Sequence, residues 1–103
     1  MNSFILEHYN KYKDELDGYT YIHNENIDLV SPGGLIKFIN INGELKGGGI
    51  VLMVLNKDKL TEMKYFMKIP GKTYYLSYSN NYIFFTTNAK NKMRRILNNI
   101  LKS

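Results

Sequence analysis

The residue types that carry out catalysis or bind metal ions are scarce in this chain of 103 residues. The best grouping is His23 with Glu25 and Asp28, three metal-binding side chain types within one predicted loop. A protein metal site usually needs a fuller ligand set than one short segment supplies. We therefore expect a solvated loop here, with no metal and no cofactor. The other histidine, His8, follows Glu7 on a predicted helix.

Covalent catalysis has no candidate nucleophile in this sequence. There is no cysteine, and no serine lies at a spacing from a histidine and an acid that suggests a catalytic arrangement. Two histidines and nine acidic residues are also a small inventory for acid–base chemistry. The sequence therefore predicts a protein that is not an enzyme, and no catalytic residue is assigned.

Two glycine-containing segments match phosphate-binding loops only in part. Gly71-Lys72-Thr73 has the end of a P-loop, but Phe66 occupies the position of its first glycine and a predicted strand follows. A P-loop needs a helix there, because the amides of its first turn bind the phosphate. The three glycines at 47–49 also lack a following helix, and we expect them to bend a strand instead.

The net charge of +5 and the isoelectric point near 9.4 favour an acidic partner such as nucleic acid. Nucleotide bias is a competing explanation, because Lys, Asn, Ile and Tyr have AT-rich codons and only two of the fourteen basic residues are Arg. An ordinary solvated helix face is a further alternative for the basic C-terminal segment. The candidate nucleic-acid-binding residues are Lys64, Lys68, Lys72, Lys90, Lys92, Arg94 and Arg95.

Three aromatic side chains form a second candidate surface. A hairpin about Asn80-Asn81 is expected to place Tyr75, Tyr82 and Phe84 on one face. Such a face can stack on bases, form a cage or a peptide groove, or be covered by the C-terminal helix. The opposite face of this hairpin is the predicted core, with Tyr74, Leu76, Tyr78, Ile83 and Phe85.

The central predicted strand spans 44–55. Its six consecutive apolar residues, 50–55, leave neither face for solvent, so other elements must cover both. Asn42-Gly43 precedes this strand and favours a hairpin with a type I′ turn. A further strand is predicted at 63–69, with Tyr65, Met67 and Ile69 on one face and two lysines and Phe66 on the other.

These elements predict one mainly β domain of the α+β class, spanning 1–103. A helix at 3–17 precedes a β-meander or barrel at 33–87, and a second helix follows at 88–102. The expected architecture is a small SH3-like or partly open antiparallel β-barrel of about five strands with a helix at each end.

Three short segments resemble a recurring pattern in small β-rich proteins of giant DNA viruses, namely mimivirus and its relatives. They are Pro32-Gly33-Gly34-Leu35-Ile36-Lys37-Phe38-Ile39, Leu45-Lys46-Gly47-Gly48-Gly49-Ile50 and Tyr82-Ile83-Phe84-Phe85. The resemblance covers roughly residues 32–87. It implies a compact viral β-module that is made in the cytoplasm of the infected host, and it implies no activity and no site residue.

The resulting expectation is a non-catalytic binding module that contacts DNA or RNA through a basic helix face and nearby lysines. The alternative is a structural or protein-interaction module, such as a homodimer, that uses the aromatic hairpin face or an edge strand. No apolar run approaches the roughly 20 residues of a membrane helix, and the N-terminus lacks the apolar core of a signal peptide. We therefore expect no membrane partner and an intracellular location, in the host cytoplasm or the virion.

Overall fold

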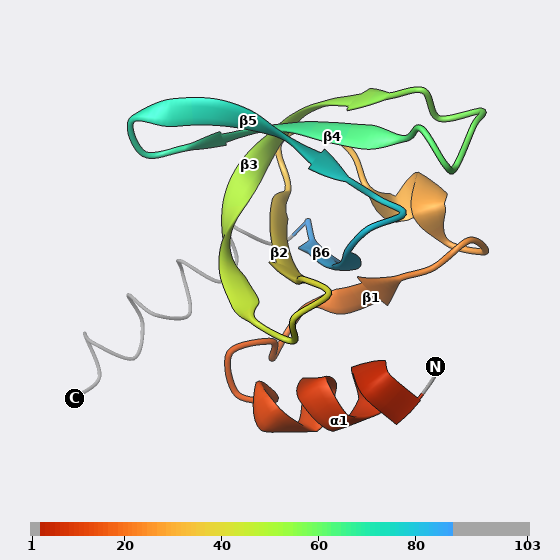
Figure 1. The fold of residues 1–103 in the computed structure, drawn as a ribbon. Helices are drawn as coiled ribbons and strands as arrows, with labels where there is room; N and C mark the ends of the chain where they lie inside the picture. Colours follow the sequence, from red (N-terminus) through yellow and green to blue (C-terminus); the bar gives the residue numbers. More distant parts are fainter. Residues whose placement is uncertain (1–2, 88–103) are drawn as a thin grey trace.

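The computed structural model describes residues 3–87 of the chain, and Figure 1 shows their arrangement. The predicted helix at 88–102 lies outside these residues, as do Lys90, Lys92, Arg94 and Arg95. The described elements are α1 (Ser3–Lys11), β1 (Thr20–Ile22), the 3-10 helix η1 (Ile27–Leu29), β2 (Leu35–Ile39), β3 (Leu45–Leu55), β4 (Lys64–Ile69), β5 (Lys72–Ser77) and β6 (Tyr82–Thr86).

The six strands form one antiparallel sheet in the order β1-β6-β2-β3-β4-β5. The edge strands are β1 and β5, and no ladder joins them within residues 3–87, so the sheet is open. A mainly β protein with an N-terminal helix is therefore confirmed. The described part of the chain contains six strands rather than about five.

The predicted hairpin between the last two strands is wrong. Within residues 3–87, strand β5 pairs with β4 alone, whereas β6 crosses to the other part of the sheet and inserts between β1 and β2. The physical reason is burial: four of the five β6 residues are buried, from both faces, while β5 has the alternating pattern of an edge strand. A strand that is apolar on both faces is stabilised best in the middle of a sheet. The order of strands in this sheet therefore differs from that of a simple meander.

The sheet curls around one hydrophobic core. Every strand contributes to a single cluster of buried side chains on the inner face, and residues 30 and 63 from the connections join it. The predicted core residues Leu76, Ile83 and Phe85 are buried in this cluster, and Tyr74 and Tyr78 pack against it. The prediction of faces is therefore confirmed although the strand pairing was wrong, because side-chain alternation does not depend on which strand lies alongside.

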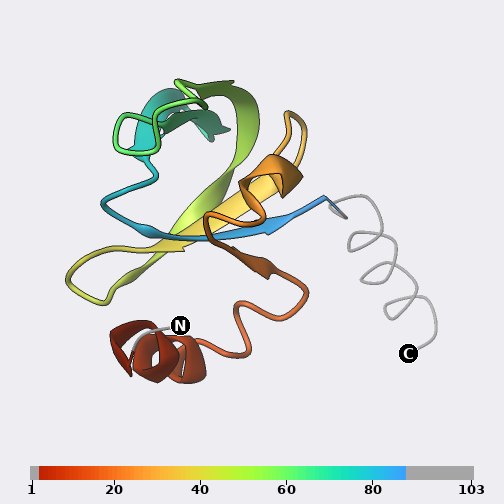
Figure 2. The same ribbon diagram turned by 90° about the vertical axis from the view of Figure 1, so that its right-hand side faces the viewer.

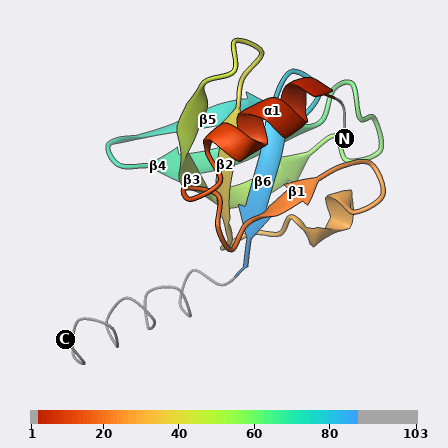
Figure 3. The same ribbon diagram turned by 90° about the horizontal axis from the view of Figure 1, so that it is seen from below.

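Helix α1 covers part of the outer face of the sheet, over β6 and β2, as Figure 3 shows from below. Ile5 of α1 and Leu16 of the following turn pack with Ile39 and Phe84 in a second cluster, and all four are essentially inaccessible. Tyr9 adds a stacked contact with Phe84, with ring centroids 6.0 Å apart. In Figures 1 and 2, β4 and β5 lie at the opposite end of the molecule from α1.

The regular part of α1 is shorter than the predicted helix at 3–17. It ends at Lys11, and turns continue to Gly18, whose positive φ of 83° reverses the chain. Three acidic residues between positions 14 and 17 would oppose the negative C-terminal end of a longer helix dipole, which favours the early end. Within the described residues, no helix has the length and apolarity needed to cross a membrane.

The hairpin between β2 and β3 is confirmed, but its turn is not type I′. Gly43 has a positive φ of 80° whereas Asn42 does not, and the Gly43 amide donates to the Asn40 carbonyl at 2.9 Å. The Asn40 side-chain oxygen accepts from the amides of Asn42 and Glu44, both at 3.0 Å. This side-chain cap stabilises a three-residue loop with one left-handed residue, which is the next most common hairpin geometry.

The glycines of β3 lie where the register with β2 shifts. Ile36 pairs with Gly49 but Phe38 pairs with Lys46, so β3 contains one extra residue at this point. A second shift follows between Val51 and Met53 against β4. The predicted bend at 47–49 is therefore present as a bulge. The two register shifts bend β3, which pairs with β2 along its first half and with β4 along its second half.

Candidate nucleic-acid interface

The outer face of β3, β4 and β5 is not covered by α1. Its apolar side chains are exposed: Ile50 by 46%, Leu52 by 41%, Met53 by 51% and Tyr75 by 60%. Isolated apolar residues are common on protein surfaces, but a continuous set across three paired strands is not. We call this set, together with Phe66, the open face. Such a surface indicates a contact with another molecule or another part of the chain.

At the centre of the open face lies a stacked aromatic pair. Met53, Phe66 and Tyr75 are cross-strand neighbours in β3, β4 and β5. The Phe66 and Tyr75 rings have centroids 4.8 Å apart and planes inclined by only 23°. This near-parallel packing presents one extended π-surface, because both rings stand on the same side of the sheet.

Two lysines flank this aromatic pair. Lys64 and Lys68 lie two residues before and after Phe66 on β4, and both are exposed. Alternation along the strand puts them on the same face as Phe66. Within residues 3–87, neither lysine forms an ion pair with an acidic side chain. A negatively charged chain that crosses the rings would therefore meet an ammonium group on either side.

Lys72 lies on the other face of the sheet. It pairs with Ile69 at the start of β5, and it alternates with Tyr74 and the buried Leu76 rather than with Tyr75. Of the three described candidate lysines, the structure thus brings Lys64 and Lys68 together and separates Lys72 from them. The signal was present in the sequence, because Lys72 is two residues before a predicted core position.

The predicted aromatic surface is divided between two places. Tyr75 is exposed on the open face, whereas Phe84 is fully buried beneath α1 and Tyr82 is partly buried beside it. Tyr82 contacts the Phe4 ring, with centroids 5.4 Å apart. The grouping of Tyr75, Tyr82 and Phe84 as one surface is therefore corrected: it relied on pairing β5 with β6, which the sheet order excludes.

Acidic residues are absent from the second part of the sequence. Residues 63–103 contain eight Lys and Arg and no Asp or Glu, whereas residues 1–62 contain six basic and all nine acidic residues. Strands β4, β5 and β6 all belong to the basic part. The positive charge is thus concentrated in the part of the chain that supplies Phe66 and Tyr75, which increases the local attraction for a polyanion.

A groove of about 450 Å³ lies on the inner side of the sheet. It is bordered by the beginning of β3 and by the turn between β4 and β5. Its lining combines aromatic, apolar and basic side chains, and Lys72 is among them. This groove is separate from the open face, because Tyr74 lines it from the inner side of β5 while Tyr75 points outward.

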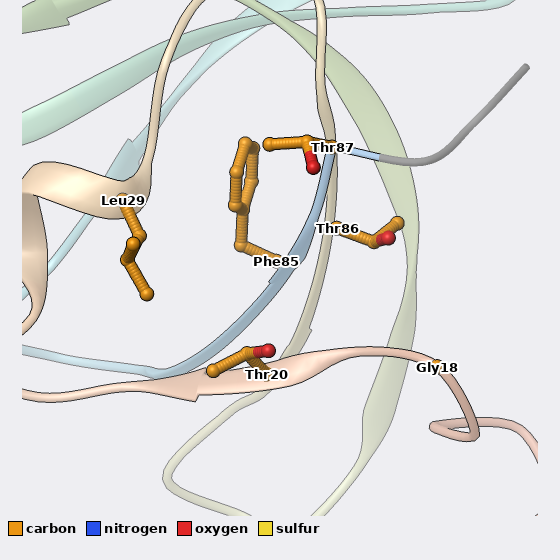
Figure 4. A pocket seen from close by; sticks show the side chains of 6 residues that line it. All are labelled: Gly18, Thr20, Leu29, Phe85, Thr86 and Thr87. Atoms are coloured by element: carbon orange, nitrogen blue, oxygen red, sulfur yellow. The ribbon is translucent and has the colours of Figure 1, made fainter.

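A smaller hollow of about 180 Å³ lies beside β1 and β6, and Figure 4 shows its lining. The Phe85 ring stands between Leu29 and Thr87, with Thr20 below. Hydroxyl and apolar groups make up this lining, and no charged side chain is part of it. The hollow therefore offers no cation for a phosphate or a carboxylate.

The loop that contains His23, Glu25 and Asp28 is organised by hydrogen bonds and one ion pair. The Asn26 side chain accepts from the His23 amide at 2.7 Å, and the Glu25 amide donates to His23 Nδ1 at 3.2 Å. Asp28 pairs with Lys57 at 3.0 Å. Among the described residues, no three His, Cys, Asp or Glu side chains gather at a distance suited to a metal ion.

Several tyrosines are perturbed by burial. Loss of solvent raises the pKa of Tyr65 strongly, with a further contribution from Tyr78, and it raises the pKa values of Tyr21 and Tyr74. These shifts keep the phenols protonated. They therefore lie in the wrong direction for a tyrosine that acts as a base near neutral pH.

Comparison with protein-family models, with curated proteins and with solved structures finds no match to this chain. The open face is therefore the feature from which a function can be inferred. The predicted aromatic surface did not include Phe66, although the expected alternation put Phe66 on the same face of its strand as Lys64 and Lys68. The six consecutive apolar residues at 50–55 leave apolar side chains on both faces of the strand. This run was the sequence signal for the apolar surface that Ile50, Leu52 and Met53 form.

Proposed function

We propose that this protein is a non-catalytic module that binds single-stranded nucleic acid on its open face. The observation that carries the proposal is the stacked Phe66–Tyr75 pair with Lys64 and Lys68 on either side. Aromatic rings on a sheet surface accept unpaired bases by stacking, and neighbouring cations contact the phosphates. Bases in a duplex are already stacked on each other, so this geometry favours a single strand.

The basic C-terminal segment extends the proposed interface. Lys90, Lys92, Arg94 and Arg95 follow β6 in a part of the sequence that has no acidic residue. Their role in this proposal rests on the sequence alone. Lys72 contributes to the positive field rather than to a direct contact, because it faces the groove.

The first experiment measures binding to a labelled single-stranded oligonucleotide by fluorescence anisotropy. We expect micromolar or tighter affinity at low salt and a linear decrease of log affinity with log salt, because phosphate contacts release counterions. DNA, RNA and a duplex of the same sequence are compared, and the duplex should bind more weakly. Affinity that does not fall with salt would refute the proposal.

Substitution then locates the interface. Tyr75→Ser removes a ring that is already 60% exposed, and we expect a loss of affinity of about tenfold with the salt dependence retained. Replacing Lys64 and Lys68 by Gln should instead reduce the slope of the salt dependence by about 1 to 2. Ile41→Ser is the matched control, since Ile41 is 73% exposed in the β2–β3 turn. Equal binding by all these variants would exclude the open face.

A third set of variants tests the C-terminal segment. Replacing Lys90, Lys92, Arg94 and Arg95 together by Ser should weaken binding and flatten the salt dependence.

A chain that ends at Thr87 tests whether residues 88–103 cover the open face. The spacing of the apolar residues at 93–101 is the sequence feature that raises this question. If truncation raises the affinity of the open face, this segment competes with the ligand. If truncation lowers it, the segment contributes to binding.

A protein partner is the second candidate, favoured by the exposure of Ile50, Leu52 and Met53 near β5, which is an edge strand of the sheet that residues 3–87 form. The Tyr78 amide donates to the Met63 carbonyl, so by alternation the backbone groups of Thr73 and Tyr75 point away from β4. An added strand would satisfy them. Sedimentation velocity tests for a homodimer of this kind, and Met53→Lys should dissociate it. A monomer at all concentrations argues for the nucleic-acid function.

We also propose that the architecture is a partly open barrel of the SH3-like kind. The single core to which all six strands contribute supports this architecture.

A viral origin is also a proposal, and it rests on the sequence resemblance alone. Its direct test is a search for the transcript and the protein in amoebae during infection.

A further inference from the structure

The groove on the inner side of the sheet has the size and lining of a ligand site. At about 450 Å³ it falls within the roughly 300–1,000 Å³ of small-molecule pockets, and the mouth of a curled sheet is a common place for one. Residues that line the groove come from the beginning of β3 and from either side of the turn between β4 and β5, two segments that Figure 1 shows. Nothing in the proposed nucleic-acid interface uses this groove.

The walls of the groove are apolar and fixed in place. Phe38 is only 9% exposed and belongs to the main core, and Tyr74 packs against the same core. Ile69 completes the apolar lining at the end of β4. Because Phe38 and Tyr74 are held by the core, this part of the groove does not have to form when a ligand binds, which reduces the entropic cost of binding.

The charged groups in the groove lining are of one sign. Lys46 and Lys72 both line the groove, and no acidic side chain does. Lys46 makes an ion pair of 3.7 Å with Glu44, but both side chains are about half exposed, so this pair is weak. Lys72 forms no ion pair with another described residue. Asn40 is engaged with the β2–β3 turn, which leaves the two ammonium groups as the polar anchors.

We propose that this groove binds a small amphiphilic anion. Its apolar or aromatic body lies against Phe38, Ile69 and Tyr74, and its single anionic head is held by Lys72 with Lys46. The groove and the open face lie on opposite faces of β5, so the two sites are independent.

The probe for this proposal is 1-anilinonaphthalene-8-sulfonate, which has an aromatic body, one sulfonate and a fluorescence that rises on binding. We expect saturable one-site binding at low salt. Decanoate should compete with the probe, whereas decanol should compete less well because it lacks the anionic head. Equal competition by the acid and the alcohol would overturn the assignment of the lysines.

Amide chemical shifts locate the probe. We expect the shifts of Asn40, Gly47, Lys72 and Tyr74 to change together on titration, because these residues line the groove. Changes confined to Ile50, Met53 and Tyr75 would instead place the probe on the open face and would overturn the proposal.

Two variants test the two halves of the site. Lys72→Gln should weaken probe binding roughly threefold to fivefold, the range of a partly exposed ion pair, while Lys59→Gln on the β3–β4 turn should leave it unchanged. Gly47→Leu should abolish binding by filling the groove. A Cβ at Gly47 meets no atom within 4 Å, and the φ of Gly47 is not positive, so neither backbone strain nor a Cβ clash opposes this change. Unchanged affinity in both Lys72→Gln and Gly47→Leu would refute the site.

Discussion

At the scale of single residues, the least satisfied group in the described structure is the hydroxyl of Tyr65. Its side chain is completely buried in the main core, and the hydroxyl has no hydrogen-bond partner among the described residues. The ring itself is well placed, with an edge contact to Tyr78 at 6.4 Å. The ring therefore stabilises the fold, whereas the hydroxyl is desolvated without compensation.

Removing that hydroxyl should stabilise the protein. We expect Tyr65→Phe to raise the free energy of unfolding by about 1 kcal/mol, because an unpaired buried polar group is lost and the ring contacts remain. Tyr78→Phe is the matched control, since the Tyr78 hydroxyl donates to Asn24 at 2.7 Å and its loss should bring no gain. Urea denaturation measures both. A destabilised Tyr65→Phe variant would mean that the hydroxyl has a partner in solution.

At the scale of elements, β3 is the strand on which the sheet depends, since it joins β2 to β4 across two register shifts. The close approach of β3 to β4 requires a glycine at one position. A Cβ at Gly49 would lie 2.8 Å from the Lys68 carbonyl oxygen and 2.9 Å from Ile69 Cγ2. Backbone atoms of a paired strand cannot move aside easily, so the position excludes a side chain.

We expect Gly49→Ala to lower the free energy of unfolding by about 1–3 kcal/mol, through displacement of β4 at Lys68. Gly47→Ala is the control on the same strand. It meets no atom within 4 Å and should be neutral, or stabilising by up to about 1 kcal/mol, because alanine restricts the unfolded chain more than glycine does. Thermal and urea unfolding distinguish the two. Similar effects of both changes would mean that glycine acts here through flexibility rather than close packing.

The sequence predicted which face of each strand is buried better than which strands are neighbours. The predicted alternation in β4 put Tyr65 and Met67 on one face and Phe66 on the other, and the structure buries Tyr65 and Met67 in the core and leaves Phe66 on the outer face. Alternation is a local property of the strand, so it survives an error in topology. The position of β6 between β1 and β2 depends on contacts between distant segments, and a polar turn at Asn80-Asn81 does not distinguish a hairpin from a crossing.

The candidate site also depends on contacts between distant segments, so the sequence predicted it only in part. The stacked pair of Phe66 and Tyr75 joins two strands, so it could be found only after β4 and β5 were known to be neighbours. Phe84 was misassigned for the same reason, because the burial of its face depends on α1 from the other end of the chain. Composition shows that the protein is basic. That Lys72 lies on the opposite face of the sheet from Lys64 and Lys68 became clear only from the register between β4 and β5.

At the scale of the whole molecule, the curl of the sheet divides its surface into three parts. One part of the outer face is closed by α1, another carries the open face, and the inner face holds the core with the groove at its mouth. All nine acidic residues lie before β4, so the strands that supply Phe66 and Tyr75 to the open face belong to the basic part of the chain, whereas Ile50, Leu52 and Met53 do not. If β4 and β5 bind a polyanion, as proposed, we expect that binding to weaken as the salt concentration rises.

The buried tyrosines also give the whole fold a dependence on alkaline pH. Burial raises the pKa values of Tyr19, Tyr21, Tyr65, Tyr74 and Tyr78 above the value of 10.0 that they have when exposed. A pKa that is raised in the folded state means that the folded protein holds the proton more tightly than the unfolded chain. The associated stability is therefore complete below about pH 10 and is lost as the pH rises through the folded-state pKa values.

We expect the melting temperature to fall steeply above about pH 10, and tyrosinate absorbance to rise together with unfolding rather than as a simple titration. Circular dichroism and absorbance, recorded on the same samples, measure the two. Tyr65→Phe should make the decline shallower, because it removes the most strongly shifted group. Independent titration of all tyrosines in a folded protein at this pH would contradict the burial of Tyr65 in the core.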